Sequence, residues 1–316
     1  MREFGFELAL CAHLEREREA IVSRQLGCGV HGRRTLDTVV IEPGPEFDER
    51  AAITPATIPP AAIESAVGPG IARDPAEAFD CHPERAADAT ERALEIGFFA
   101  PERRGGRRLV RQVARYPDWF GSIVGIENKP DLDRPGALET QLLTDVHLAA
   151  LDRVVLATAS HVTGAQLHRL PDPVGVWRFD PETGERTVIR TADQLPVETP
   201  GVEILDREPG ETEIAPVSTE AKAKLRQRVA ERAYGKGWRS YDLPACARVE
   251  PEEGLPYCPW KGRLVHPAAE CGPACDGHEP TEAPTPNVDR LRAERTPWRP
   301  DPEGRRRGQA GLDRFG

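Results

Sequence analysis

This sequence of 316 residues has few lysines and no long hydrophobic runs. Only five lysines stand among the 42 Lys and Arg residues, and Lys129 is the single lysine of the first 221 positions. No stretch approaches the ~18 consecutive apolar residues of a membrane span. The N-terminus has no hydrophobic signal core either. These absences predict a cytoplasmic protein with no membrane partner.

The net charge of −10 comes from 52 acidic residues against 42 basic ones. Such an excess of acid argues against non-specific binding of nucleic acid by the whole surface, but it leaves room for a local basic patch. An acid-rich, lysine-poor composition resembles that of salt-adapted cytoplasmic proteins. The length suffices for one large domain or two small ones with a sizeable core.

Four of the seven cysteines crowd into one short segment, as Cys246, Cys258, Cys271 and Cys275. They are not spread like the disulfide framework of a small secreted protein, so a reducing compartment and metal binding are expected. Four thiolates suffice for a closed Zn²⁺ site, and nearby prolines and glycines favour knuckle-like loops. Because the spacing is not the paired two-residue form, a metal-free segment remains an alternative.

The most informative stretch is the β-branched run Ile123-Val124-Gly125-Ile126, which predicts a buried strand. Glu127 and Lys129 follow it two residues apart, so both side chains leave the same face. Pro130 then ends the strand. A carboxylate and an ammonium here indicate a metal and phosphate site, with a strand-end salt bridge as the alternative. The similar triplet at 220–222 lies in a charge-rich helical run and is interpreted as a solvated face.

The other elements predict a mixed α/β sheet flanked by helices across residues 1–195. A helix over 3–24 carries Glu7, a buried-face acid that needs a partner. A strand over 33–41 carries Asp37, and a helix over 136–151 carries Gln141 beside its apolar face. A strand over 153–159 and a hairpin over 174–189 complete the expected core.

An insert over residues 50–118 interrupts this core. It begins with proline-rich sequence and continues with short helices near 60–67 and 83–97. A basic, glycine-centred stretch follows and resembles the tip of a small winged-helix-like fold that could lie on DNA phosphates. The alternative is a solvated helix that pairs with the surrounding acids. Its arginines are Arg103, Arg104, Arg107, Arg108, Arg111 and Arg115.

The remaining chain is expected to have three parts. Residues 196–217 are acidic and proline-containing, which favours a linker. Residues 218–280 combine a helix with the small Cys-rich metal-binding module. Residues 281–316 are dominated by Pro, Arg and Glu, which predicts a disordered tail.

The order of Glu7 on a helix, Asp37 on a strand, Glu127-x-Lys129 on a strand and Gln141 on a helix resembles the PD-(D/E)XK nuclease superfamily. The resemblance covers the first 195 residues, apart from the insert, and it implies a restriction-endonuclease-like fold. Some exonucleases of this superfamily hold their core with a four-cysteine [4Fe–4S] cluster, so the resemblance makes such a cluster the rival of Zn²⁺ at the C-terminal cysteines. Two positions depart from the family pattern. Leu36 stands where the motif names proline, and Asp145 stands where some members carry the tyrosine of a Gln-x-x-x-Tyr helix motif.

The resemblance also implies a chemistry. Asp37, Glu127 and the Asn128 carbonyl would offer oxygen ligands to Mg²⁺ or Mn²⁺. Lys129 would orient or deprotonate the attacking water, Glu7 would serve a second metal ion, and Gln141 would position the phosphate or Lys129. The implied function is metal-dependent cleavage of DNA, in repair or defence. The alternative is a catalytically silent DNA-binding or regulatory protein on the same fold.

Overall fold

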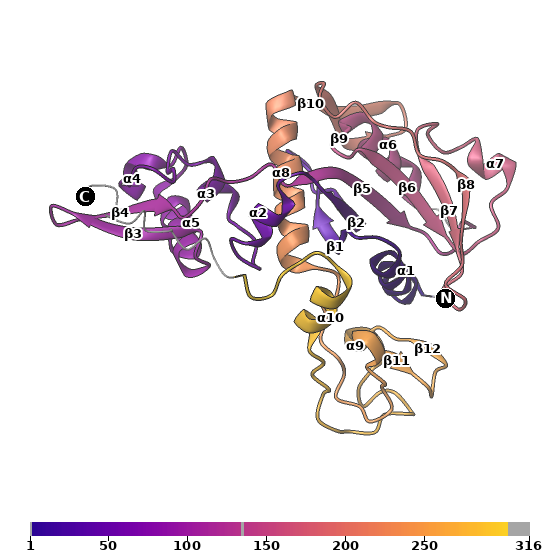
Figure 1. Cartoon of the computed structure of the whole chain (residues 1–316). Helices are drawn as coiled ribbons and strands as arrows, with labels where there is room; N and C mark the ends of the chain where they lie inside the picture. The colour runs from indigo at the N-terminus through magenta and orange to yellow at the C-terminus, as the bar shows by residue number, and fades with distance from the viewer. Residues whose placement is uncertain (1, 134–135, 303–316) are drawn as a thin grey trace. The chain divides into compact units, whose positions relative to one another are not determined.

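The computed structural model describes residues 2–133 and 136–302 and has a six-stranded mixed sheet flanked by helices (Figure 1). The mixed α/β architecture expected from the sequence is thereby confirmed. The strand order is β1-β2-β5-β6-β7-β8; β5, β6 and β7 run parallel, and the other neighbours pair antiparallel. The strands are β1 (Ile21–Gly27), β2 (Thr35–Pro43), β5 (Phe120–Asn128), β6 (Arg153–Thr158), β7 (Gly175–Phe179) and β8 (Arg186–Arg190).

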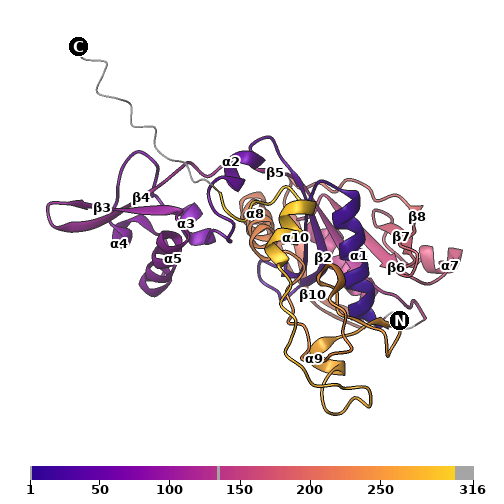
Figure 2. The ribbon, with the colours of Figure 1, turned by 60° about the horizontal axis from the view of Figure 1, so that its bottom comes forward.

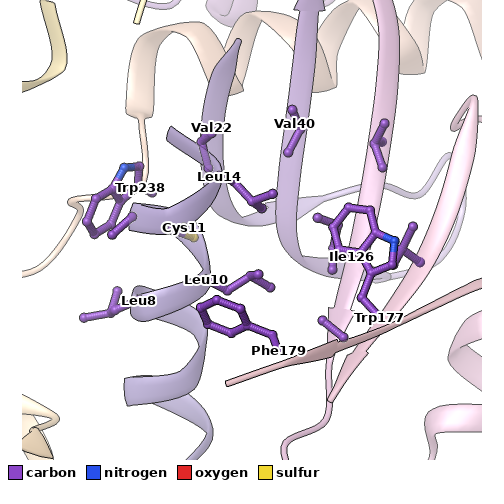
Figure 3. Packing of buried hydrophobic residues seen from close by; sticks show 14 of the residues in the cluster. Leu8, Leu10, Cys11, Leu14, Val22, Val40, Ile126, Trp177, Phe179 and Trp238 are labelled. Atoms are coloured by element: carbon purple, nitrogen blue, oxygen red, sulfur yellow. The ribbon is translucent and has the colours of Figure 1, made fainter. Parts of the chain in front are cut away.

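Helix α1 (Glu3–Glu17) covers one face of the sheet and forms the main hydrophobic core with it (Figure 3). Its buried Phe6, Leu10 and Leu14 recur every fourth residue, which keeps them on one side of a helix. They pack against alternate strand residues, of which Val40 and Ile126 are examples. The spacing of four residues in the helix and of two in the strands therefore brings these apolar side chains together in one layer.

Helix α8 (Thr219–Lys236) packs against the opposite face. Val22 belongs to the α1 layer, so the next strand residue, Ser23, points to the other face, where it donates to the Gly237 carbonyl at the end of α8. The buried Asp152 carboxylate fixes this helix to the sheet: it accepts from the Ile123 amide at 2.7 Å and from Arg226 of α8 at 2.9 Å. Helix α6 (Leu138–Leu148) forms the crossover between the parallel strands β5 and β6. With both faces covered, β5 is buried continuously from residue 123 to 128.

The insert unit, Pro45–Trp119, is a separate compact unit with its own core. Three of its helices begin with proline at the first helical positions, where the missing N–H costs no hydrogen bond, so the prolines start helices here. Phe98, Phe99 and Val110 are central to the core. The elements are α2 (Phe47–Ala51), α3 (Pro60–Glu64), α4 (Pro75–Ala78), α5 (Pro83–Glu95), β3 (Phe99–Arg104) and β4 (Arg107–Gln112).

The second compact unit, here the core unit, comprises residues 2–44 and 120–298, so position 195 does not end a compact unit. The Cys-rich segment belongs to it and contacts α1 through the Phe4 ring, which lies 4.1 Å from the His266 ring. Its elements after β8 are α8, β9 (Gly201–Glu208), β10 (Glu211–Val217), η1 (Glu252–Gly254), β11 (Tyr257–Cys258), β12 (Arg263–Leu264), α9 (Pro267–Glu270) and α10 (Val288–Arg295). The short helix α7 (Gly164–Leu167) precedes β7.

Two expectations about helices are wrong in part. The helix predicted over 3–24 ends at Glu17, and Ile21 and Val22 instead begin β1, paired with Ile41 and Val40. Sheet pairing of these β-branched residues overrides the continuing helical spacing. In the 220–222 triplet, Lys222 is fully buried rather than solvated, and its ammonium donates to the Pro196 carbonyl at 3.0 Å.

The linker expected over 196–217 is also wrong, because β9 and β10 form a hairpin there. Glu203 of β9 is 1% exposed, and its carboxylate accepts the amide protons of Val30, His31 and Gly32. This acid is therefore structural and anchors the loop between β1 and β2. A charge count cannot tell such an acid from a solvated one.

The disordered tail expected over 281–316 is wrong for 288–295, which form α10 beside α8 (Figure 2). Arg292 is 7% exposed and donates to the carbonyls of Ala233 and Tyr234 near the end of α8. A cation there satisfies carbonyls that the helix itself leaves unpaired. Residues 303–316 of the expected tail lie outside the described residues. No helix in the described part of the chain combines the length and apolarity needed to cross a membrane.

Candidate active site

Carboxylates from α1, β2 and β5 meet where β1 and β5 end and β2 begins. The Gln25 amide nitrogen lies 3.2 Å from one Glu7 oxygen and 3.3 Å from one Asp37 oxygen, and so joins the two acids. Arg24 donates to Glu7 at 2.7 Å. Glu7 thus has the partners that an acid on a buried helix face requires.

Asp37 and Glu127 lie on the same face of the sheet. The antiparallel register pairs Thr38 with Ile126, so the next position toward this end sets Asp37 opposite Glu127. The Asp37 carboxylate also accepts the Asn128 amide proton at 2.9 Å. An oxygen of Asp37 is therefore held beside the end of β5.

Arg34, from the loop between β1 and β2, links Glu127 to a further carboxylate, that of Asp145. Its Nη2 lies 2.7 Å from Glu127 Oε2 and 2.7 Å from Asp145 Oδ2, while its Nε donates to Asp145 Oδ1 at 2.9 Å. The loop is closed by the Cys28 amide, which donates to the Arg34 carbonyl at 2.8 Å. Burial of the guanidinium acts to lower its pKa, but Asp145 and Glu127 together outweigh this effect and raise it.

Sequence reasoning missed Gln25, Arg34 and Asp145. The sequence motif shows Asp145 only as the residue that stands where some nucleases have a tyrosine. Its burial on a core helix indicates a buried partner. Gln25 has a positive φ of 51° inside β1 and is left out of the pairing with β2, although Arg24 and Leu26 on either side of it keep the same register. That local distortion has no clear sequence signal in a residue other than glycine.

The site crowds acids in a place where water is scarce. Burial raises the pKa of Glu127 to about 7, an effect that Arg34 opposes and Asp37 reinforces. Burial likewise raises the pKa of Glu7 and of Asp145, while Arg24 and Arg34 respectively act against it. Adding a further cation would relieve this repulsion.

The raised pKa of Glu127 makes stability depend on pH. Between about pH 4.5 and pH 7 the folded protein keeps a proton on Glu127 that the unfolded chain has lost. The free energy of unfolding therefore falls as pH rises through this range, by about 3 kcal/mol, and levels off above it. Chemical denaturation at several pH values should show this slope in the wild type. The slope should be smaller in Glu127→Gln, and equal slopes would contradict the assignment.

The structure places Lys129 directly after β5, half-buried, with its amide bonded to the Ala157 carbonyl at 2.9 Å. Its ammonium forms no ion pair with any acid of the described residues. The strand-end salt bridge considered from the sequence is thus not formed within that part of the chain. Gln141 lies one turn before Asp145 on α6, half-buried, and its side chain has no hydrogen bond to the described residues.

No group of three or more His, Cys, Asp or Glu side chains in residues 2–133 and 136–302 is already arranged to hold a metal ion. At the acidic site, one oxygen of Glu127 is taken by Arg34, and the two oxygens of Asp37 accept from the Gln25 side chain and from the Asn128 amide. The donor types still fit Mg²⁺ or Mn²⁺, which prefer carboxylate and carbonyl oxygens.

The six arginines of the basic stretch lie on or just after the β3–β4 hairpin, with Gly105 and Gly106 in left-handed conformations at its turn. The register sets Arg103 opposite Arg108 and Arg104 opposite Arg107. Like charges placed directly opposite are destabilising. Glu102 pairs with Arg104 and lies 3.9 Å from Arg111, and Arg115 pairs with Glu46. The other three arginines have no acidic partner among the described residues.

Three of the four C-terminal cysteines, Cys246, Cys258 and Cys271, pack in a small cluster with Val249 and Val265, and Cys271 interacts electrostatically with the other three. Three of the four cysteines begin a tight turn, in which their carbonyl accepts the amide proton three residues later. The pairs are Cys246 with Val249 at 3.1 Å, Cys258 with Lys261 at 3.0 Å and Cys275 with His278 at 2.9 Å. Burial raises the pKa of Cys271, and its neighbour Lys261 lowers it.

The chain belongs to a family of unknown function (DUF5787), whose model matches residues 21–280. The matched part includes β1, the insert unit and the Cys-rich segment, but not Glu7. No curated protein and no solved structure matches the chain.

Proposed function

We propose that this member of a family of unknown function is a metal-dependent DNA nuclease that hydrolyses phosphodiester bonds. The series of contacts that joins Glu7 through Gln25 to Asp37, with Asp37 opposite Glu127, carries the proposal. A fold needs no such group of acids, since each one loses hydration when it is buried. Selection for a cation-dependent reaction accounts for them.

Each side chain then has a chemical task. Asp37, Glu127 and the Asn128 carbonyl would hold Mg²⁺ or Mn²⁺, which would supply counter-charge for the scissile phosphate. Lys129 has an ammonium without an acidic partner in the described residues, and it would aim the attacking water and balance charge in the transition state. Glu7 shapes the acidic edge through Gln25 and would serve a second ion. Gln141 would contact the backbone phosphate.

The direct test is incubation of the purified protein with labelled single-stranded and double-stranded DNA. Cleavage is expected with Mg²⁺ or Mn²⁺, and none with excess chelator. Cleavage that survives chelation would assign the activity to another mechanism or to a contaminant, and the Glu127→Gln variant separates these two cases. An RNA substrate of matched sequence tests the preference for DNA.

The alternative function is a DNA-binding or regulatory protein on a nuclease-like fold that no longer cuts. The observation in its favour is that Arg34 already neutralises Glu127 and Asp145, and no metal group is preformed in the described residues. Retained DNA binding without cleavage under any divalent metal would select it.

We propose that the β3–β4 hairpin contacts DNA phosphates, because three of its arginines lack acidic partners in the described chain and two like-charged pairs face each other. Replacing Arg103, Arg107 and Arg108 with alanine should weaken DNA binding more than tenfold. It should also lower the slope of log affinity against log salt by about 3, one unit for each phosphate contact. Fluorescence anisotropy across a salt series measures both quantities.

The control for the hairpin variant is Arg85→Ala, which removes an exposed arginine from α5 of the same unit. It should change neither the affinity nor the salt slope appreciably. An equal effect of both variants would indicate general charge attraction rather than a contact surface.

We further propose that the Cys-rich segment binds Zn²⁺ through Cys246, Cys258, Cys271 and Cys275. The turns that begin at three of these cysteines support it, since such knuckles aim a thiolate at a shared centre. Elemental analysis should find one zinc per chain in the wild type and in Cys81→Ser, but much less in Cys258→Ser. A brown, anaerobically purified protein that absorbs near 400 nm would instead indicate [4Fe–4S].

A further inference from the structure

Arg34 contacts two carboxylates of the acidic site, and the two contacts are unequal. Two of its nitrogens bond both oxygens of Asp145, and only one nitrogen, Nη2, is shared with Glu127. The fork of a guanidinium fits a carboxylate best in this two-point arrangement. The pair with Asp145 is therefore the stronger attachment, and the contact with Glu127 is the one that can be released.

The loop that carries Arg34 is fixed independently of the acidic site. The amides of Val30, His31 and Gly32 bond the buried Glu203 carboxylate at distances of 2.7 to 3.2 Å. Asp145 is fixed by its position on α6, where it is 3% exposed. The loop that carries Arg34 and the Asp145 side chain are thus held by contacts that do not involve Glu127.

We propose that Arg34 is a built-in competitor for divalent metal: tethered by Asp145, it occupies Glu127 Oε2 until Mg²⁺ or Mn²⁺ displaces it. This inference rests on the proposed function, because it deepens the description of the same metal site. Arg34 neutralises the carboxylates when metal is absent, which stabilises the unoccupied fold. It also lowers metal affinity, because each binding event must first break the Arg34–Glu127 contact. Arg34 is thus a positioning residue that sets the metal concentration at which the site fills.

The test compares Mn²⁺ binding to the full-length wild type, Arg34→Gln and Arg33→Gln by isothermal titration calorimetry. Removing the guanidinium should tighten Mn²⁺ binding about tenfold or more, because one opposing positive charge at contact distance is lost. It should also lower the thermal midpoint without metal and enlarge the increase that Mn²⁺ produces. Arg33 is the exposed neighbour, and its substitution should leave Mn²⁺ affinity unchanged.

Arg34→Lys provides a second measurement if the glutamine variant does not fold. A lysine keeps the charge but cannot bond Asp145 at two points, so Mn²⁺ should bind several-fold more tightly than to the wild type. Equal Mn²⁺ affinity of the folded Arg34 variants and the wild type would overturn the inference, even if metal-dependent cleavage is found. Failure of all of them to bind Mn²⁺ would overturn it as well. Tighter binding without any DNA cleavage would support the inference and reject the nuclease.

Discussion

Replacing Lys129 with alanine is expected to lower metal-dependent DNA cleavage by about 10³-fold while the fold stays intact. The side chain is half-buried at the end of β5 and has no ion-pair partner among the described residues, so its loss breaks no structural contact there. Its loss would remove the one amine expected near the attacking water. Single-turnover cleavage of labelled DNA measures the effect, and thermal unfolding measures the fold.

Two variants separate this role from a general effect of charge. Lys129→Arg keeps the positive charge but cannot give up a proton, so it should restore DNA binding and little of the cleavage rate. Lys224→Ala removes an exposed lysine of α8 that pairs with Glu220, and it should cleave like the wild type. Unchanged cleavage by Lys129→Ala would remove Lys129 from the mechanism and weaken the proposed nuclease.

The strands of the sheet other than β1 were predictable because their signals are local. Ile123, Val124 and Ile126 are β-branched, flanked by glycine and proline, and buried as expected. The same-face placement of Asp37 and Glu127 also follows from strand alternation once the two strands pair, and the register sets them opposite each other. A sequence therefore indicates which segments form strands and on which face of a strand each residue lies.

The remainder of the site depends on contacts between distant residues. Arg34 meets Asp145 across 111 positions, and Glu203 bonds the loop before Arg34 across 173 positions. Nothing in a local window distinguishes these acids from the solvated acids around them, because burial is decided by which elements pack together. The same reason explains why an acidic hairpin was interpreted as a linker, and why a docked helix was placed in a disordered tail.

Glu15 illustrates this most sharply, since it lies in the charged run that ends α1 and yet is 2% exposed. Its carboxylate accepts from the Trp238 indole at 3.0 Å and from Arg239 at 2.9 and 2.6 Å. These residues follow α8, so one acid joins the N-terminal helix to the segment that leads into the Cys-rich part. The Arg239 guanidinium also lies over the Trp238 ring, 4.0 Å from its centre.

Replacing Glu15 with alanine should lower the free energy of unfolding by about 3–5 kcal/mol, because it leaves a buried arginine without a counter-charge. Glu15→Gln should cost less, since an amide oxygen can still accept one of the three hydrogen bonds. The matched control is Glu19→Gln, a change at an exposed acid four residues later, which should stay within about 0.5 kcal/mol of the wild type. Urea denaturation of the three variants measures these differences. A loss below about 1 kcal/mol for Glu15→Ala would mean that Arg239 finds water or another acceptor, and that α1 and the C-terminal segment are joined mainly by apolar contacts.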